Sequence, residues 1–277
     1  MPELPEVEST VRSLRKEVLG KTFVGGWQES GKDWVERAKG KKVVNIERVG
    51  KNILLLLDDG YTMLVHLRMT GYLLLGNWKY KDNEWIAEEK DLEERSNRFL
   101  RFILFLDDGR SLALSDARKF AKVSFISRKE ERDLRRNLGP DPFSLSKKDF
   151  LSLLKGKKRE IKPLLMDQSF LAGIGNIYAS EILFKAKINP KKKSYLLNEE
   201  EIESIYCHMK DILEKAIELK GDSTSDYRLT DGSKGGYQER HLVYKREGLP
   251  CFDCHSRIKR STVGNRGTYF CPKCQKL

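Results

Sequence analysis

The first residues of the chain could supply an amine nucleophile. Methionine aminopeptidase generally cleaves after Met1 when the second residue is small, which would expose Pro2 as a secondary amine. An α-amine titrates near pH ~8, so a useful fraction is unprotonated at neutral pH, unlike a lysine near ~10. Such an amine can attack the anomeric carbon of a sugar and form a cationic iminium. Glu3 and Glu6 lie close by to move a proton and to position groups. On these residues alone, an ordinary N-terminus is the better interpretation.

Four cysteines near the C-terminus have the spacing of a metal site. Cys251-x2-Cys254 and Cys271-x2-Cys274 are separated by sixteen residues. Each pair presents two thiolates to one ion, and two pairs complete a tetrahedral shell around zinc. Because four protein ligands leave no open position, we expect one structural Zn²⁺ and no catalytic metal or organic cofactor. Free or disulfide-linked cysteines are the alternative.

The segment between the two cysteine pairs is expected to form a hairpin with Arg266 at or near its tip. An arginine in that position would suit a phosphate contact. A solvated turn explains the same residues equally well.

The composition favours a polyanionic partner. The formal charge is +12, and 34% of the residues are charged. Nucleic acid is the commonest partner of so basic a protein, although simple solubility or an anionic membrane surface would also fit. No signal peptide is recognisable, and no apolar run is long enough to span a bilayer. Clustered cysteines indicate a reducing compartment, so we expect a soluble cytoplasmic protein.

The N-terminal half is expected to be rich in strands after one opening helix. Apolar residues recur at helical spacing from Val7, and Gly20 suits the position after the helix end. Turn signals at 58–60 and 107–109 predict two similar hairpins, which could be related hairpins of one sandwich. Residues 77–97 are highly charged and are interpreted as a surface excursion. The expected strands are 43–49, 53–57, 61–67, 99–106 and 111–114.

Helices are expected to dominate the second half. Ser146 can cap a helix reaching about Leu154, and Asn198 with Glu201 resembles a capping box before a long apolar stripe. The charged stretch ending at Pro142 is the best linker. The expected class is therefore α+β. The expected parts are a catalytic β-sandwich domain (1–130), a linker (131–145), a helical domain (146–240) and a zinc-binding hairpin (241–277).

Five segments together resemble the bacterial formamidopyrimidine-DNA glycosylase family. The start from Pro2 to Glu8 matches the characteristic beginning of that family, and the other segments follow in the family's order. They are Gly50–Asn52, His66–Gly71, Asp116–Phe120 and 165–181, with the cysteine hairpin completing the set. The resemblance implies an opening helix, a β-sandwich, a helix–two-turn–helix motif and a zinc hairpin.

The resemblance also implies roles for individual residues. The expected catalytic residues are Pro2 as the nucleophile, Glu3 as the general acid/base with Glu6 beside it, and Lys51, which would bind phosphates flanking the lesion and help position the base. A damaged base must be flipped out of the duplex to be reached. The residues implied to contact DNA are His66, Met69, Arg118, Lys119, Phe120, Asn176, Tyr178 and Arg266. Met69, Arg118 and Phe120 would fill the vacated space, and His66 would support their loop.

A loop at 221–238 would cover the flipped base. Ser223, Thr224 and Tyr227 resemble residues whose backbone amides meet the base. Ala117 and Lys119 depart from the family's usual Pro and Arg, and lysine cannot reproduce a bidentate arginine contact.

The resemblance implies a bifunctional DNA glycosylase/AP lyase that excises oxidised purines (8-oxoguanine and formamidopyrimidines) through a Schiff base and then cleaves by β,δ-elimination. Two alternatives are an endonuclease VIII-type enzyme for oxidised pyrimidines and a non-enzymatic damage-binding protein. The expected partner is double-stranded DNA with oxidised bases or abasic sites. We expect a monomer at the bacterial nucleoid, with no membrane association.

Overall fold

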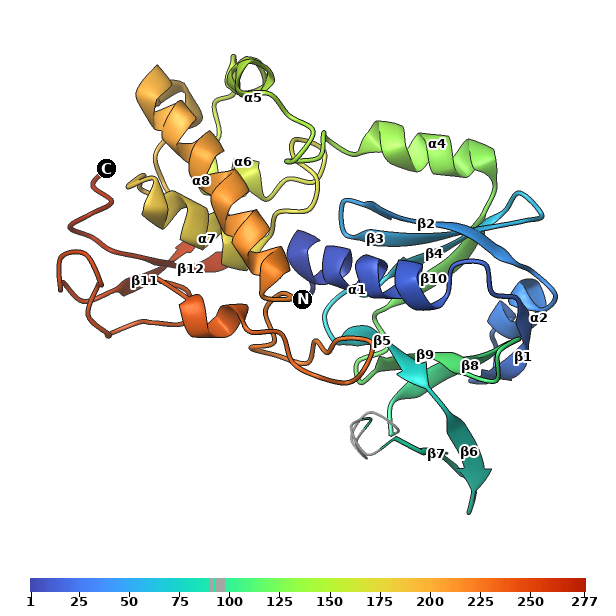
Figure 1. The fold of residues 1–277 in the computed structure, drawn as a ribbon. Coiled ribbons are helices and arrows are strands. Elements are labelled where there is room, and N and C mark those ends of the chain that lie inside the picture. Colours follow the sequence, from blue (N-terminus) through green and yellow to red (C-terminus); the bar gives the residue numbers. More distant parts are fainter. Residues whose placement is uncertain (90–91, 93–97) are drawn as a thin grey trace. The chain divides into compact units, whose positions relative to one another are not determined.

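The computed structural model describes residues 1–89, 92 and 98–277, and in it the chain forms two compact units. Unit 1 consists of Met1–Arg135 together with Leu219–Gly236, and unit 2 of Arg136–Glu218 together with Tyr237–Leu277. Figure 1 follows the chain through both, and each unit is described by itself. No helix among the described residues is long and apolar enough to cross a membrane.

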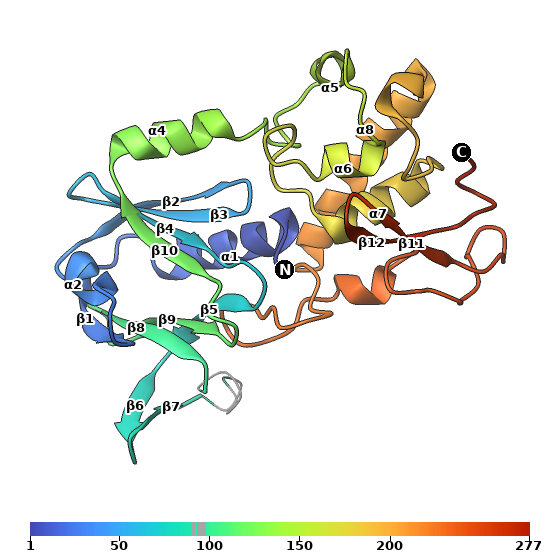
Figure 2. The same ribbon diagram turned by 180° about the vertical axis from the view of Figure 1, so that it is seen from behind.

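Unit 1 is built on two antiparallel four-stranded sheets, ordered β1-β8-β9-β5 and β10-β4-β3-β2. Figure 2 shows these strands from behind. Inward-facing apolar side chains of both sheets form one buried cluster that includes Phe23, Ile53, Val65 and Phe102. The β-sandwich prediction is therefore confirmed. The strands are β1 (Phe23–Gln28), β2 (Val43–Val49), β3 (Asn52–Leu57), β4 (Thr62–His66), β5 (Gly71–Gly76), β6 (Trp78–Lys81), β7 (Glu84–Ala87), β8 (Leu100–Leu106), β9 (Ser111–Asp116) and β10 (Lys122–Ile126).

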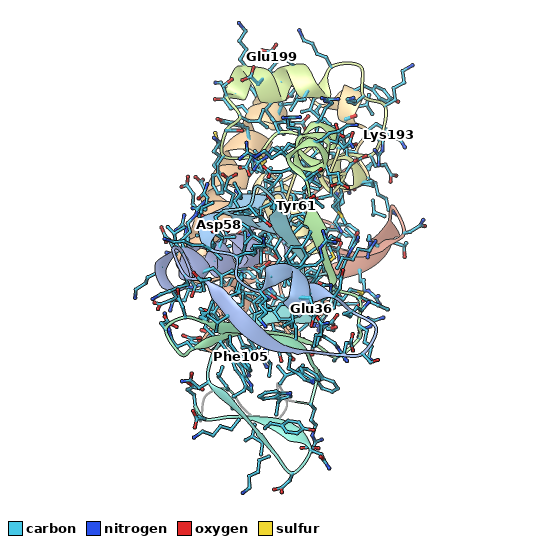
Figure 3. All side chains as sticks on the ribbon, turned by 90° about the vertical axis from the view of Figure 1, so that its right-hand side faces the viewer. Glu36, Asp58, Tyr61, Phe105, Lys193 and Glu199 are labelled. Atoms are coloured by element: carbon cyan, nitrogen blue, oxygen red, sulfur yellow. The ribbon has the colours of Figure 1, made fainter. Side chains whose placement is uncertain are left out.

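The two expected hairpins are present, one in each sheet. Asp58 and Tyr61 lie on either side of the β3–β4 turn, as labelled in Figure 3. Gly60 there and Gly109 in the β8–β9 turn both have positive φ. In both turns the glycine N–H donates to the carbonyl three residues earlier, at 3.1 Å. The similarity of the two sequences therefore reflects one turn geometry used twice.

Helix α1 (Leu4–Glu17) opens unit 1 and packs on the sandwich. Val7, Val11 and Leu14 lie on one face of the helix and are fully buried in the sandwich core. This spacing of about one turn is what the apolar pattern predicted. Burying three such side chains contributes roughly 1.5–3 kcal/mol each, which fixes the helix against the sheets.

A short helix, a small hairpin and most of one further helix complete the first segment of unit 1. Short helix α2 (Trp34–Ala38) packs on β1, and β6 pairs with β7 within the expected 77–97 excursion. Residues 90–91 and 93–97 of that excursion lie outside the described part of the chain. Helix α4 (Arg128–Asn137) buries no residue and occupies the start of the expected linker.

Unit 2 consists of helices and one two-stranded sheet. The expected caps are present: Ser146 Oγ accepts the Asp149 N–H, and Asn198 Oδ1 accepts the Glu201 N–H. The elements are α5 (Lys147–Leu154), α6 (Ile161–Leu165), α7 (Asn176–Lys185), the 3₁₀ turn η1 (Ser194–Leu196), α8 (Glu199–Glu218), η2 (Tyr237–Arg240), β11 (Lys259–Val263) and β12 (Arg266–Phe270).

The unit boundaries differ from the expected domain boundaries: the expected linker 131–145 is divided between the two units, and the hairpin 241–277 groups with the helices in unit 2. Residues 219–236, expected to belong with the helical domain, group with unit 1 instead. The physical reason is a set of hydrogen bonds from this segment to α1, described below. Sequence pattern could not anticipate them, because they join residues more than two hundred positions apart.

Candidate functional site

The predicted catalytic residues Pro2, Glu3 and Glu6 lie at the start of α1 in unit 1, with Pro2 and Glu3 immediately before the helix. All three are buried. Glu3 is the N-cap residue, and its side chain and that of Glu6 form a reciprocal capping box. Glu6 Oε2 accepts the Glu3 N–H at 2.7 Å, so one carboxylate fixes the backbone immediately after Pro2. A negative charge there also complements the positive end of the helix dipole.

Glu6 also anchors the segment that was expected to cover a flipped base. Its Oε1 accepts the Asp222 N–H at 2.7 Å, and its backbone carbonyl accepts the Tyr227 hydroxyl at 2.9 Å. Burial, above all, raises the pKa of Tyr227, so this phenol stays protonated and remains a donor. Glu6 therefore ties the start of α1 to the 219–236 segment by two separate contacts.

The expected base-covering residues are packed within this segment. Ser223 Oγ accepts the Gly235 N–H at 2.9 Å, and Thr224 donates its N–H to Asp222 Oδ1 at 3.0 Å. Gly235 has no room for a side chain, because an added Cβ would lie 2.3 Å from the Gly221 carbonyl oxygen. The Tyr227 side chain is buried and serves as an anchor through its hydroxyl contact with α1.

Lys51 lies at the two-residue turn between β2 and β3, where Val49 pairs with Asn52. Gly50, the first turn residue, has φ +59°, whereas Lys51 has no positive φ, which is the pattern of a type II′ turn. The Asn52 side chain donates to the Val49 carbonyl at 3.0 Å and closes the turn. Lys51 is 6% exposed, so the turn presents a largely buried ammonium group.

The three residues expected to fill the space of a flipped base are brought together on two loops. Met69 and Phe120 are exposed, with Arg118 between them: its guanidinium donates to Met69 Sδ at 3.4 Å and lies 4.6 Å from the Phe120 ring centroid. Arg68 and Lys119, the neighbours of this group, both have positive φ, which is uncommon for side chains with a Cβ. Lys119 itself pairs with Glu29 at 3.5 Å.

Asp116 organises both loops, a role that the sequence analysis did not assign. It is fully buried, and its carboxylate accepts the Thr70 hydroxyl, the Arg118 N–H at 3.2 Å and the Ala121 N–H at 2.7 Å. The two loops are thus hydrogen-bonded to one carboxylate. Asp116 begins one of the family-like segments, but its position before a turn does not by itself indicate partners on a second loop.

His66 ends β4 and supports the first of these loops. Its Nδ1 accepts the Arg68 N–H at 3.1 Å. Burial, followed by the positive charges of Arg68, Lys51 and Lys122, lowers the pKa of His66 to about 4. The ring is therefore neutral at pH 7 and acts here as a hydrogen-bond acceptor.

In unit 2, Asn176 is the first residue of α7 and links that helix to the β11–β12 hairpin. Its Oδ1 accepts Lys162 Nζ at 2.6 Å, and its Nδ2 donates to the Gly267 carbonyl at 3.0 Å. Lys162 also donates to Thr268 Oγ1 at 2.7 Å and is completely buried. Lys162 was not predicted from the sequence, because nothing local distinguishes it among the 53 basic residues.

Arg266 follows a two-residue turn in which Gly264 and Asn265 both have positive φ, as in a type I′ hairpin. It is exposed at the expected place near the tip. Tyr178, in contrast, is completely buried with its ring 5.2 Å from that of Tyr237. Its side chain packs within unit 2, so only its backbone is available to a ligand.

The four clustered cysteines lie in the arrangement that a metal ion requires. Their sulfur atoms are all within 4.8 Å of one another, with 3.9 Å between Cys251 and Cys274 and 3.4 Å between Cys254 and Cys271. Tetrahedral zinc with bonds of ~2.3 Å would place sulfurs ~3.8 Å apart. No disulfide joins any of the four, and the residues fit a metal centre.

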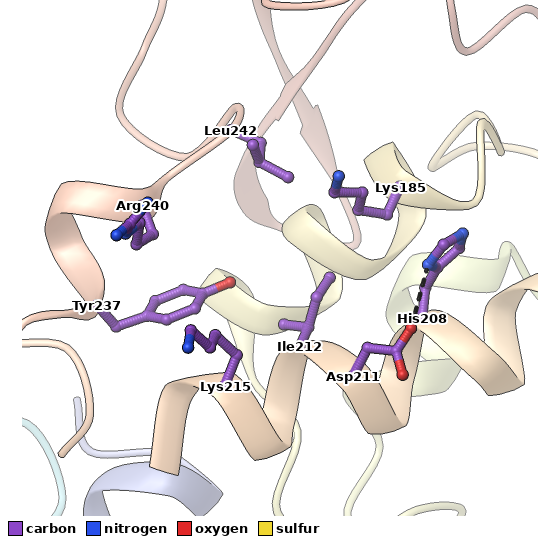
Figure 4. A pocket seen from close by; sticks show the side chains of 8 residues that line it. All are labelled: Lys185, His208, Asp211, Ile212, Lys215, Tyr237, Arg240 and Leu242. Atoms are coloured by element: carbon purple, nitrogen blue, oxygen red, sulfur yellow. Dashed lines mark ion pairs between the residues drawn. The ribbon is translucent and has the colours of Figure 1, made fainter. Parts of the chain in front are cut away.

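Unit 2 also contains a cavity of about 560 Å³ between the end of α7, α8 and η2, lined in part by Lys185, Lys215 and Arg240 (Figure 4). Lys185 lies nine positions after Asn176 on the same helix. Nine residues make two and a half helical turns, so the two side chains leave α7 on opposite sides. The cavity is therefore separate from the Asn176 network.

The chain is similar to known proteins over its whole length. Family models described as the formamidopyrimidine-DNA glycosylase N-terminal domain and H2TH domain match residues 1–123 and 138–228. A formamidopyrimidine-DNA glycosylase of Heliobacterium modesticaldum is 37% identical over 100% of both chains. One of Thermus thermophilus is 38% identical over 99% of this chain and 98% of its own.

Solved structures agree with these relatives. A Lactococcus lactis FPG mutant in complex with Fapy-dG-containing DNA matches with a TM-score of 0.86 and 32% identity over 100% of both chains. MutM in complex with DNA containing carbocyclic 8-oxo-G matches with a TM-score of 0.84 at 32% identity, over 100% of both chains.

The sandwich, the helical module and the cysteine hairpin thus define the class as a DNA glycosylase. The chain belongs to the formamidopyrimidine-DNA glycosylase family.

Proposed function

We propose that this enzyme is a bifunctional DNA glycosylase and AP lyase that excises oxidised purines, 8-oxoguanine and formamidopyrimidines, with Pro2 as its nucleophile. The observation that carries the proposal is the start of α1, where Pro2 and Glu3 are buried and Glu6 fixes the backbone after them. A binding protein would have no need for an amine and a carboxylate held together in this way.

The chemistry follows from these two residues once Met1 is removed. The Pro2 nitrogen forms a bond to C1′ while the N-glycosidic bond breaks and the base leaves with a proton. Glu3 donates a proton to the sugar ring oxygen as the ring opens, which gives a cationic iminium. The iminium acidifies C2′, so loss of that proton expels the 3′ phosphate, and a second elimination expels the 5′ phosphate. Hydrolysis then frees Pro2.

The proposed substrate is double-stranded DNA containing an oxidised base or an abasic site. The base must leave the stack to reach Pro2, and the exposed group of Met69, Arg118 and Phe120 has the chemistry to replace it: two apolar wedges and one donor for the orphaned base. Lys51, Asn176 and Arg266 are proposed phosphate ligands, Ser223 and Thr224 cover the base with their backbone, and His66 and Lys119 support the loops.

We further propose that the cysteine cluster binds zinc and that this ion is structural, because four thiolates fill its coordination shell. The chemistry described above uses protein groups alone. We propose that the enzyme works as a monomer in the bacterial cytoplasm, at the nucleoid, which size-exclusion chromatography with light scattering and microscopy of a tagged protein would check.

Borohydride trapping on a duplex with one 8-oxoguanine tests the proposal. Reduction converts the iminium into a stable amine, so wild-type protein should become covalently attached to DNA. The matched control carries an N-terminal tag that blocks the Pro2 amine and should yield no adduct. An adduct that persists with the tag would rule out Pro2, and tight lesion binding without any adduct would favour a non-enzymatic damage-binding protein.

The family's second substrate class is the main alternative. Endonuclease VIII-type enzymes prefer oxidised pyrimidines but usually have Gly where this chain has Leu4, and they lack the Arg118 and Phe120 pattern. Excision of 8-oxoguanine should therefore be faster than excision of thymine glycol, each opposite its natural partner. The reverse order would assign the enzyme to oxidised pyrimidines.

A further inference from the structure

An ion pair joins α1 to the turn that carries Lys51. Glu8 Oε2 accepts Arg48 Nε at 2.8 Å, and Glu8 Oε1 accepts Arg12 Nε at 2.9 Å. The Glu8 and Arg48 side chains are only 14% and 9% exposed. Burial opposes ionisation of Glu8, but the hydrogen bonds from Arg48 and Arg12 outweigh it and lower its pKa, so the carboxylate is charged.

The other end of the Arg48 guanidinium reaches the turn itself. Arg48 Nη1 donates to the Gly50 carbonyl at 3.4 Å. That carbonyl belongs to the peptide bond between Gly50 and Lys51, so its direction sets how Lys51 leaves the turn. The planar guanidinium fork makes both contacts in one fixed geometry, which an ammonium group cannot reproduce.

The pair is not needed to hold α1 in place. The helix already buries Val7, Val11 and Leu14 in the sandwich core, and a largely buried ion pair adds little net stability because desolvation offsets its attraction. A second contact, from Arg15 Nε to the Ile46 carbonyl at 2.6 Å, joins the same helix to the same strand. Arg15 lies two turns after Glu8, farther from Pro2.

We propose that Glu8 and Arg48 are positioning residues for the reaction: they fix the Gly50–Lys51 peptide relative to the helix that begins directly after Pro2 and Glu3. The proposal rests on the function proposed above for Pro2 and Lys51. The pair thereby links α1 to the Gly50–Lys51 turn through one charged contact. A displacement of a catalytic group by about 1 Å can lower the rate by a factor of ~100.

The first test compares Arg48→Met with the matched control Arg15→Met. Both remove a guanidinium contact between α1 and β2, but only Arg48 reaches the Lys51 turn. In single-turnover trapping on 8-oxoguanine DNA, Arg48→Met should slow adduct formation about tenfold, with DNA affinity changed less than about threefold. Arg15→Met removes the contact of an exposed side chain with a neutral carbonyl, so it should lower Tm less than Arg48→Met and keep the wild-type rate. Equal slowing in both variants would make the pair merely structural.

The conservative variant and a double-mutant cycle sharpen the result. Arg48→Lys restores the charge opposite Glu8 but lacks the fork, so Tm should recover while the rate stays low. Glu8→Gln combined with Arg48→Met should be no slower than Arg48→Met alone, because both act through one contact. Multiplied rate losses, or full recovery of the rate with lysine, would overturn the proposal.

A readout without DNA separates this proposal from the proposed function. The amide NMR signals of Gly50 and Lys51 should move in Arg48→Met and remain in place in Arg15→Met. If wild-type protein formed no adduct, the proposed function would fail, yet these signals would still report whether Arg48 fixes the turn. Unmoved signals in Arg48→Met would refute the positioning role.

Discussion

At the scale of single residues, buried carboxylates set the geometry of the site. Asp116 accepts donors from the Met69 loop and from the Arg118 loop, and Glu6 accepts the N–H groups of Glu3 and Asp222. Each joins backbone segments far apart in sequence. Removing the donors of a buried carboxylate, or the carboxylate itself, costs far more folding free energy than breaking an exposed pair.

Replacing Asp116 should therefore affect both loops at once. Asp116→Asn substitutes a donor for one acceptor oxygen and should cost about 2–3 kcal/mol of unfolding free energy, with an excision rate lowered at least about tenfold. Urea unfolding and single-turnover excision measure the two effects. Asp33→Asn, a 69% exposed side chain of the same unit with an ion pair of 4.0 Å to Arg37, is the control and should change neither appreciably. An unimpaired Asp116→Asn enzyme would show that the loops hold their conformation independently.

His66 should make the fold sensitive to mild acid. Because its pKa is lowered to about 4 in the folded protein from about 6.5 when unfolded, the unfolded chain takes up a proton first as pH falls. Its contribution to stability is complete above pH ~6.5 and is lost as pH falls toward 4, at up to about 1.4 kcal/mol per pH unit.

The lowered pKa of His66 can be checked by NMR, and the loss of stability as the pH falls can be checked by thermal unfolding. The His66 ring should not titrate between pH 8 and 5 in the folded protein. His66→Asn keeps an acceptor for the Arg68 N–H without a titrating ring, so its Tm should fall less between pH 7.5 and 5 than that of wild type. A His66 midpoint near 6.5 would contradict the prediction.

At the scale of elements, two hairpins of one sheet share a glycine requirement but differ in what they carry. Gly50 and Gly60 both have positive φ, and only the first turn bears Lys51. Gly50→Ala and Gly60→Ala should each cost about 1–2 kcal/mol of stability, because a Cβ disfavours this region. Only Gly50→Ala should also slow excision, by about tenfold. Equal rates in the two variants would argue against any need for a fixed Lys51 turn.

Elements whose conformation is set by residues close in sequence could be predicted, whereas features set by distant contacts could not. The α1 stripe, the paired Asp-Asp-Gly turns and the Ser146 and Asn198 caps rest on neighbours within a few positions, and all were confirmed. The roles of Asp116 and Lys162 and the attachment of 219–236 to α1 depend on contacts between distant residues. Tyr178 shows the same limit, since its family motif gave no indication that its ring would be buried.

At the scale of the whole molecule, the charge of +12 should dominate DNA binding. Affinity should fall linearly with salt on a logarithmic scale, by about 0.9 per phosphate neutralised. Arg266→Gln should reduce that slope by about one and weaken binding to damaged and undamaged DNA alike. Lys273→Gln, another cation of the same hairpin module, is the control expected to keep the slope. Fluorescence anisotropy at several salt concentrations measures the slope. An unchanged slope for Arg266→Gln would show that Arg266 does not bind a phosphate.

Removal of the metal should act on the same module. Chelation or Cys254→Ser should unfold the hairpin that presents Arg266 and weaken DNA binding by about tenfold or more, because ligation supplies folding energy to so small a sheet. Cys207→Ser, outside the cluster, should retain both zinc and affinity. Metal content and fluorescence anisotropy, measured on the same samples, show whether loss of the metal weakens DNA binding. Full affinity without metal would assign the cluster no role in binding.

The composition of unit 1 from two separate stretches of chain has a consequence for how the protein is made. Residues 1–135 leave the ribosome first, but the acceptor Glu6 meets the Asp222 N–H and the Tyr227 hydroxyl only after residue 227 has been synthesised. At about 5–20 residues per second, roughly 5 to 20 seconds separate the two stretches. The sandwich can fold during that interval, whereas the surroundings of Pro2 are completed only near the end of translation. In a nascent chain the proposed nucleophile Pro2 is therefore not yet fully enclosed, and the N-terminal residues, although made early, are completed last by their surroundings.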